Sequence, residues 1–177
     1  MLHAVLMLWA ACHAGWALAN AEVRAVQELL AAGQPHLALQ RLEAREATAG
    51  ADGAVAAGVD AELRFLRGVA LMDLRRDAEA LAWFERMTQD LPELPDPYNN
   101  IALLHVRGGR LEPARQALET ALRNDPSFRV ARANLGLVYL MLAVQAWDQV
   151  AASGPVDPQL ARRLEGARAL LSAPPPR

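Results

Sequence analysis

Apolar residues recur along most of this chain at the three- and four-residue spacing of amphipathic helices. The spacing predicts helices over residues 20–32, 36–47, 61–75, 77–90, 96–107, 111–124 and 129–142, and a last one starting at Asp157-Pro158. Glycine and proline fall between most of these segments, where they favour turns and end helices. The pattern therefore predicts an all-α chain of short antiparallel helix pairs.

Several positions recur 34 residues apart. Ala80 returns as Ala114 and Pro92 as Pro126. The same interval relates Gly68, Ala102 and Gly136, and also Leu71, His105 and Tyr139. A helix pair that repeats at this period cannot bury its apolar face alone, so neighbouring pairs stack. The period predicts an elongated binding surface rather than a catalytic pocket.

The repeat becomes irregular at two places. Residues 48–60 are rich in alanine and glycine and predict a loop, which adds eight residues because Ala38 and Ala80 lie 42 apart. No glycine or proline marks a turn near Ala143. Two structures remain open there: a shortened turn, or one long helix from Val130 to Ala152. Residues 157–172 are expected to form a capping helix, and residues 173–177 a disordered tail.

Composition excludes several classes of protein. Hydrophobic residues make up 53% of the chain and charged residues 21%, which is typical of a folded protein. The net charge of −2 gives no clustered positive surface, so we expect no nucleic-acid partner. His36 and His105 stand alone, without the ligand spacing of a metal site. No catalytic motif is present, so we expect no enzymatic activity and no cofactor.

The first 19 residues contain no charged side chain and end in Ala17-Leu18-Ala19, a small-x-small pattern that signal peptidase cuts. We therefore expect residues 1–19 to be a secretory signal peptide and the mature chain to be periplasmic. The alternatives are an uncleaved membrane anchor, or lipidation at Cys12, the single cysteine. We expect a membrane association only through one of those two routes.

The repeated positions resemble the tetratricopeptide repeat. Residues 95–128 match its pattern best, through Tyr98, Ile101, Ala102, Gly109, Ala114, Leu118, Ala121 and Pro126. Units of about 20–47, 61–94 and 129–152 match less completely. The resemblance implies a right-handed solenoid of three to four helix pairs plus the capping helix, over residues 20–172.

The chain also resembles small secreted tetratricopeptide-repeat proteins of Gram-negative bacteria. That resemblance implies a non-enzymatic adaptor or scaffold of the cell envelope, which binds a protein or peptide segment in its concave groove. Two alternatives remain: a structural subunit that assembles through its outer helical faces, and an accessory factor of an envelope enzyme system such as cytochrome maturation or cell-wall hydrolysis.

In this family the first helix of each pair lines the concave face. Transferred residue by residue, this register predicts groove positions at Phe65, Val69, Asn99, Asn100, Leu103, Asn134 and Leu137. Asn100 and Asn134 are 34 residues apart, and their amides could pair with the backbone of a bound peptide. The alternative is that both amides hydrogen-bond a neighbouring helix or cap the turn at Pro97. The positions of a carboxylate clamp are not basic here, so we expect an apolar groove.

Overall fold

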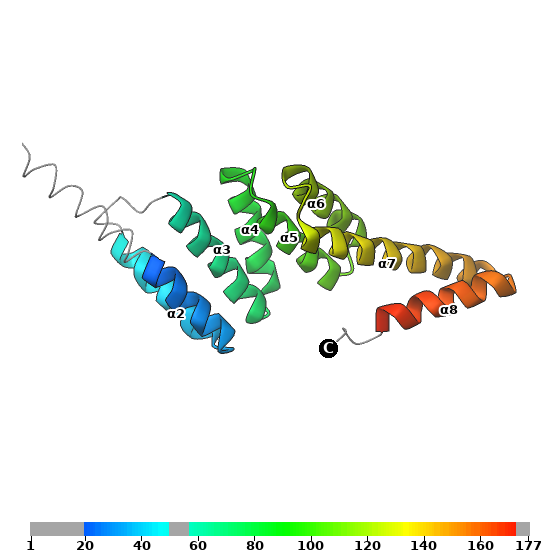
Figure 1. The fold of residues 1–177 in the computed structure, drawn as a ribbon. Coiled ribbons are helices and arrows are strands. Elements are labelled where there is room, and N and C mark those ends of the chain that lie inside the picture. The colour runs from blue at the N-terminus through cyan, green and yellow to red at the C-terminus, as the bar shows by residue number, and fades with distance from the viewer. Residues whose placement is uncertain (1–19, 50–56, 173–177) are drawn as a thin grey trace, which may run out of the picture. The chain divides into compact units, whose positions relative to one another are not determined.

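The structure, a computed structural model, describes residues 20–49 and 57–172 of the chain. Every regular element in these ranges is an α-helix, which confirms the predicted all-α fold of stacked helix pairs (Figure 1). Residues 20–31 are helical. They are followed by α2 (Pro35–Ala49), α3 (Ala57–Asp73), α4 (Asp77–Asp90), α5 (Pro95–Arg107), α6 (Leu111–Asn124), α7 (Arg129–Ser153) and α8 (Pro158–Ser172). The predicted signal peptide and the predicted tail lie outside the described residues.

The chain divides into two compact units, Met1–Met87 and Thr88–Arg177, with the boundary near the end of α4. We refer to them as unit 1 and unit 2. In unit 1, Val26, Ala38 and Phe84 are completely buried. Arg41 of α2 forms an ion pair with Glu22 at 2.8 Å, and Gln27 donates a hydrogen bond to Glu62 of α3 at 2.9 Å. These contacts join three successive helices around one apolar core.

The predicted loop over residues 48–60 is too long at both ends. Helix α2 continues to Ala49, and α3 begins at Ala57, four residues before the predicted start at residue 61. Alanine has the highest helix propensity, which favours extension from both sides. Asp60 lies in the first turn of α3, where a carboxylate interacts favourably with the helix dipole.

The first helix of three successive pairs ends in the same backbone conformation. Gly33, Arg75 and Gly109 have φ values of 68°, 59° and 70°. The amide after each donates to the carbonyl five residues back: Gln34 to Leu29, Arg76 to Leu71, and Arg110 to His105. A positive φ favours glycine. Glycine therefore indicates the turns at Gly33 and Gly109 in the sequence, whereas no glycine indicates the turn at Arg75.

A close approach of two helices at Gly68 organises unit 1. A Cβ atom placed on Gly68 of α3 would lie 2.3 Å from the ring of Phe84 in α4. That ring is completely buried, and it also packs against Phe65 with 5.8 Å between the ring centroids. Glycine at this position therefore allows the phenylalanine ring to contact the α3 backbone directly.

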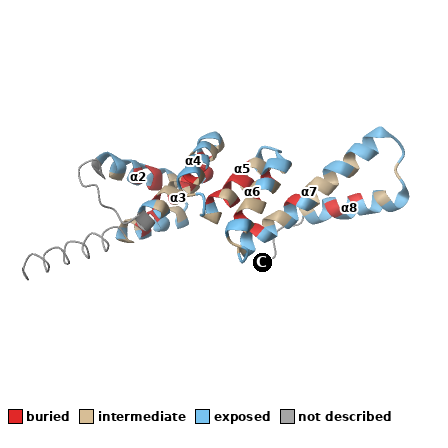
Figure 2. Ribbon diagram, turned by 90° about the horizontal axis from the view of Figure 1, so that it is seen from above, coloured by how far each residue is buried: buried red, intermediate tan, exposed pale blue. Residues whose placement is uncertain are grey.

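Unit 2 repeats this arrangement with smaller side chains. Its buried core joins α5, α6 and α7 through Ala102, Ala114, Leu118, Ala121, Ala131 and Val138 (Figure 2). Ala102 occupies the position that corresponds to Gly68, and it is completely buried. Alanine at the contact points keeps the helices close, and one leucine fills the space between them.

Helix α7 is a single helix of 25 residues, so the long-helix alternative is the correct one. Among the described residues, it is the helix that is long and apolar enough to cross a membrane by length and composition, since an 18-residue stretch of it has a mean hydropathy of 1.3. Two of its residues, Ala131 and Val138, are buried. Since no turn signal interrupts the sequence near Ala143, helix formation continues and leaves much apolar surface exposed.

Helix α8 packs on the later part of α7. Asp157 accepts a hydrogen bond from the amide of Leu160 at 3.3 Å, which matches the predicted N-cap. Leu164 and Ala167 are buried, and Arg168 forms an ion pair with Asp148 of α7 at 2.5 Å. Leu170, by contrast, is 68% exposed. The terminal helix thus has a buried stripe, but its outer side is not uniformly polar.

Two glycine substitutions test the packing difference between equivalent positions. We expect Gly68→Ala to lower the free energy of unfolding by about 1–3 kcal/mol, because the buried Phe84 ring must move. Gly136→Ala should raise it by about 1 kcal/mol, because a Cβ atom there meets nothing within 4 Å and alanine favours helix. Urea unfolding followed by circular dichroism measures both changes. Equal effects of the two substitutions would contradict this account.

Candidate protein-binding groove

The seven predicted groove residues fall in both units. Phe65 and Val69 lie on α3 in unit 1. The other five lie in unit 2: Asn99, Asn100 and Leu103 on α5, and Asn134 and Leu137 on α7.

Unit 2 brings three of the predicted residues to one small hollow of about 60 Å³. Leu103, Asn134 and Leu137 line it together with Ala102, Val106, Leu118, Val138 and Met141. We call this hollow the unit 2 groove. Its lining is aliphatic apart from Asn134, and Leu137 is 50% exposed. Such a surface suits an apolar side chain better than a charged one.

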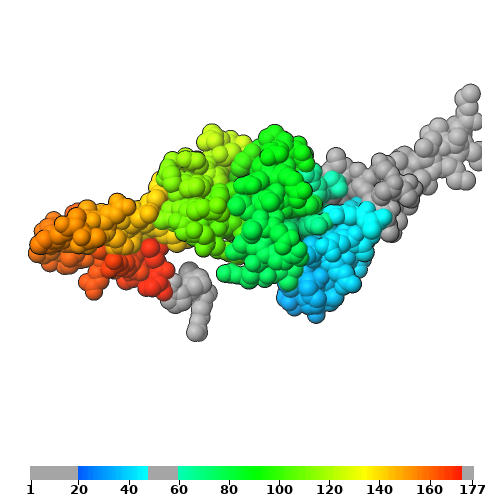
Figure 3. All heavy atoms as spheres, turned by 180° about the vertical axis from the view of Figure 1, so that it is seen from behind, coloured from blue at the N-terminus to red at the C-terminus, as the bar shows by residue number. Residues whose placement is uncertain are grey.

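A wider, open cleft of about 470 Å³ continues from the same helix. We call it the α7–α8 cleft, and its lining consists of Leu111, Met141, Val144, Gln145, Asp148, Gln149, Ala152 and Leu171. Met141 lines both hollows, so they adjoin at this side chain. Figure 3 shows α7 and α8 in space-filling form, from yellow to red. The two hollows together form an apolar path along α7.

Asn134 is already engaged with a neighbouring helix. Its Nδ2 donates a hydrogen bond of 2.9 Å to Oδ1 of Asn99, which is 7% exposed. Of the alternatives that the sequence left open, a bond to a neighbouring helix is therefore present for Asn134. A side-chain amide has one oxygen acceptor and two N–H donors, so this bond uses one of the hydrogen-bonding groups of Asn134.

Asn100 does not lie on an exposed surface where a ligand could reach it directly. Its side chain is buried, with 9% of the residue exposed, whereas Asn134 is half-buried. Residues 34 apart in sequence thus have different surroundings. A ligand at the unit 2 groove meets Asn134 first, and it reaches Asn100 only if neighbouring atoms move.

Phe65 and Val69 of unit 1 are half-buried. The Phe65 ring packs on the buried Phe84 ring, with an angle of 54° between the ring planes. This tilted contact is a favourable arrangement of two aromatic rings. Phe65 therefore has a packing role within unit 1, and part of its surface remains open.

Trp83 lines a hollow of about 180 Å³ in unit 1. Its Nε1 donates a hydrogen bond to the carbonyl of Arg64 at 2.7 Å. The guanidinium groups of Arg67 and Arg86 lie 4.5 and 5.2 Å from its ring centroid, within the range of cation–π attraction. Glu43 and Glu79 line the same hollow. Acidic side chains thus balance the charge of the arginines, and the Trp83 hydrogen bond joins α4 to α3.

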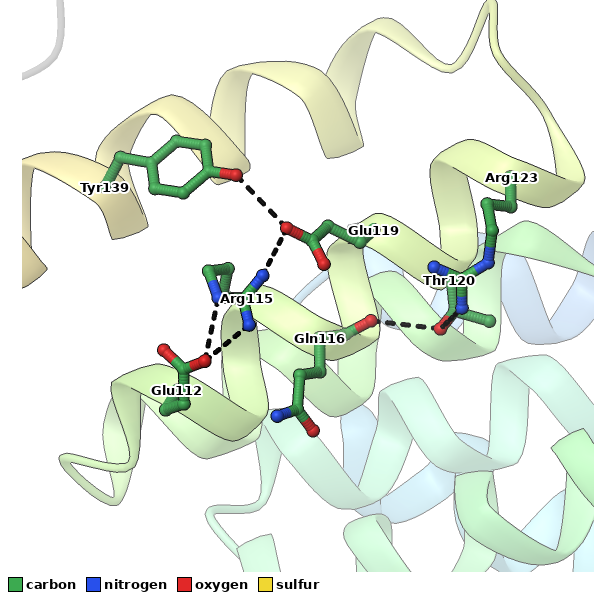
Figure 4. A network of polar contacts seen from close by, with 7 residues as sticks. All are labelled: Glu112, Arg115, Gln116, Glu119, Thr120, Arg123 and Tyr139. Carbon is green, nitrogen blue, oxygen red and sulfur yellow. Dashed lines mark hydrogen bonds and ion pairs between the residues drawn. The ribbon is translucent and has the colours of Figure 1, made fainter.

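A polar network joins α6 to α7 away from the unit 2 groove (Figure 4). Arg115 bonds to both Glu112 and Glu119, and the hydroxyl of Tyr139 donates to Glu119 at 3.1 Å. The hydrogen bond from Arg115 holds the pKa of Glu112 below its usual value. Bonds to the two carboxylates raise the pKa of Arg115. The network fixes the side of α7 that carries Tyr139, and no residue in it lines the unit 2 groove.

The described residues contain no group of three or more histidine, cysteine, aspartate or glutamate side chains that could hold a metal ion. The unit 2 groove contains no ionisable side chain, and the α7–α8 cleft contains one, Asp148. These surfaces can therefore bury apolar groups of a ligand and form hydrogen bonds to it through side-chain amides.

Comparison with known proteins identifies part of unit 2. Residues 95–128 match the family model of the tetratricopeptide repeat, and this segment contains α5, α6, Asn99, Asn100 and Leu103. No curated protein matches the chain. A crystal structure of a Bacteroides ovatus protein, provisionally described as protein-binding, is 16% identical and aligns over 86% of this chain and 80% of its own. Its TM-score of 0.48 is too low to show a shared fold.

The hydrogen bond between Asn99 and Asn134 can be tested by a double-mutant cycle. We expect Asn134→Ala to cost about 1–3 kcal/mol of stability, because it leaves the buried Oδ1 of Asn99 without this donor. Adding Asn99→Ala removes the buried acceptor and should recover part of that loss. Thermal or urea unfolding of the four proteins gives the coupling energy. A coupling of zero would show that the bond contributes nothing.

Proposed function

We propose, from the premise that residues 95–128 are a tetratricopeptide repeat, that this chain is a non-enzymatic adaptor that binds an apolar segment of another protein. The observation that carries the proposal is the unit 2 groove with its exposed Leu137. A partner that binds to this half-exposed apolar surface removes it from water, and this burial favours binding.

The contacts suggest how the segment is held. Apolar contacts have no directional requirement, and the groove offers them through Leu103, Val106, Leu137 and Met141. Asn134 adds a half-buried amide at the same place, and its orientation is fixed by Asn99. An amide with a fixed orientation can pair with peptide backbone at little entropic cost. We therefore propose that large aliphatic or aromatic side chains enter the groove while a backbone group of the partner bonds to Asn134.

A matched pair of substitutions on α7 tests the groove. Leu137→Asp places a charge in the groove, and Val150→Asp places one on the same helix outside both hollows. These residues are 50% and 48% exposed, so neither change should unfold the protein. In crosslinking pull-downs quantified by mass spectrometry, we expect Leu137→Asp to reduce partner recovery by about tenfold or more. Val150→Asp should leave the same partners unchanged.

Retention of every partner by Leu137→Asp would contradict the groove proposal. So would equal losses with Leu137→Asp and Val150→Asp, because that result would indicate a general loss of structure or solubility. Circular dichroism of both variants separates these cases, since a folded variant keeps the helical signal of the wild type.

We also propose that the adaptor acts in the bacterial periplasm. The support is the uncharged run of residues 1–19, which ends in Ala17-Leu18-Ala19. If it is a signal peptide, the exported chain should begin at Asn20, and Ala19→Asp should block the cut. Cell fractionation with intact-mass measurement checks both outcomes. Recovery of the full-length wild-type chain from the cytoplasm would overturn the proposal.

A further inference from the structure

The fourth helix pair of the repeat, which begins with α7, has a first helix but lacks a second helix in the usual place. Gly136 of α7 corresponds to Gly68 of α3, at twice the 34-residue interval. At Gly68 an added Cβ atom would lie 2.3 Å from the Phe84 ring of the second helix, whereas at Gly136 it would meet nothing within 4 Å. The residue type that permits close helix packing is present at both positions, but the packing occurs at only one.

Neighbouring positions on α7 show the same difference. Leu71 on α3 is 4% exposed, and its equivalent Tyr139 on α7 is 49% exposed. Ala102, the equivalent of Gly136 on α5, is completely buried beside Ala114 and Leu118 of α6. We call the α7 surface around Arg132, Gly136 and Tyr139 the open face. It is distinct from the unit 2 groove, whose lining includes none of these three residues.

Helix α8 contacts a later part of α7. Its ion pair joins Arg168 to Asp148, and Leu171 near its end lines the cleft beside Met141. The open face begins before Met141 and is bordered by the Glu119 carboxylate of α6, to which the Tyr139 hydroxyl bonds (Figure 4). An additional helix on this face would therefore lie beside both α7 and α6.

The pairs α3–α4 and α5–α6 indicate what such a helix looks like. In unit 1, α4 buries Ala80 and, four residues later, Phe84. In unit 2, α6 buries Ala114 and Leu118 at the same spacing. Both helices run antiparallel to their partners, so their carboxyl ends lie near the start of the first helix. A small residue followed one turn later by a large apolar one thus defines the complementary helix.

Charge at the open face favours the same orientation. Arg129 and Arg132 are exposed at the start of α7, where the carboxyl end of an antiparallel helix would lie. Helix carboxyl ends carry partial negative charge and are stabilised by cations. Helix α4 ends at Asp90, and Asp125 directly follows α6, so these two second helices have acidic ends, whereas α2 ends at Ala49.

We propose that the open face binds an amphipathic helix of a partner protein, which packs antiparallel to α7 as the second helix of the fourth pair. The partner helix carries a small residue opposite Gly136, a large apolar residue one turn later, and an acidic carboxyl end near Arg129 and Arg132. This inference concerns a different surface from the unit 2 groove and stands independently of the proposed function.

A peptide taken from this chain provides the probe. Residues 77–90, which contain Ala80 and Phe84 and end at Asp90, are made as a helix-stabilised, fluorescently labelled peptide. We expect the full chain to bind it, and Gly136→Leu to weaken binding by about tenfold or more by filling the contact point. Fluorescence anisotropy measures the affinity. Amide shifts at Arg132, Gly136 and Tyr139 in NMR spectra locate the bound peptide.

Three controls make the result specific. Gly166→Leu introduces the same side chain into α8, where an added Cβ atom likewise meets nothing within 4 Å, and it should leave the affinity unchanged. Leu137→Asp disrupts the unit 2 groove and should also leave it unchanged, which separates this proposal from the groove proposal. A peptide with Phe84→Ala should bind more weakly to the wild-type chain.

Three outcomes would overturn the proposal. The first is no binding of the peptide by the wild-type chain. The second is equal binding by wild type and Gly136→Leu. The third is self-association of the wild-type chain in analytical ultracentrifugation that Gly136→Leu abolishes, which would assign the open face to a second copy of this chain.

Discussion

The close contact between a small residue on one helix and a large apolar residue on the next determines how the helix pairs form. At Gly68 this contact brings the Phe84 ring against the α3 backbone, and at Ala102 it places Leu118 in a core of alanines. Each pair can then bury its apolar stripe with short helices, because the interaxial distance is small and dispersion contacts are numerous. The turns at Gly33, Arg75 and Gly109 set the direction in which the chain returns.

The same contact explains why α7 differs from the other first helices. It retains the glycine at residue 136 but continues through the position where a turn is due, so α8 begins too late in the chain to pack there. The result is a long helix that contains an 18-residue stretch with a mean hydropathy of 1.3 and has few buried residues. In a stacked array, each pair is stabilised mainly by its neighbours, and exposed apolar surface therefore tends to concentrate at an end.

Two surfaces of unit 2 follow from this arrangement, and they differ chemically. The unit 2 groove combines apolar side chains with the amide of Asn134, which is held by its bond to Asn99. The open face instead combines a bare helix backbone at Gly136 with arginines at one end and the network of Arg115, Glu119 and Tyr139 beside it. The first suits inserted side chains, and the second suits a packed helix.

The sequence alone determined the helices, their period and the match of residues 95–128 to the tetratricopeptide repeat, because helix formation and turn chemistry depend on residues close together in the chain. It predicted α4 and α6 with their observed ends, and it found Leu103, Asn134 and Leu137, which line one hollow. It missed the left-handed turn at Arg75, where no glycine marks the position. Only the tertiary structure decided that Asn134 bonds to Asn99, that Asn100 is buried, and that Gly136 is uncovered. Residues 34 apart in the sequence occupy equivalent positions in their helices. The surroundings of each side chain, however, depend on which helices pack against it.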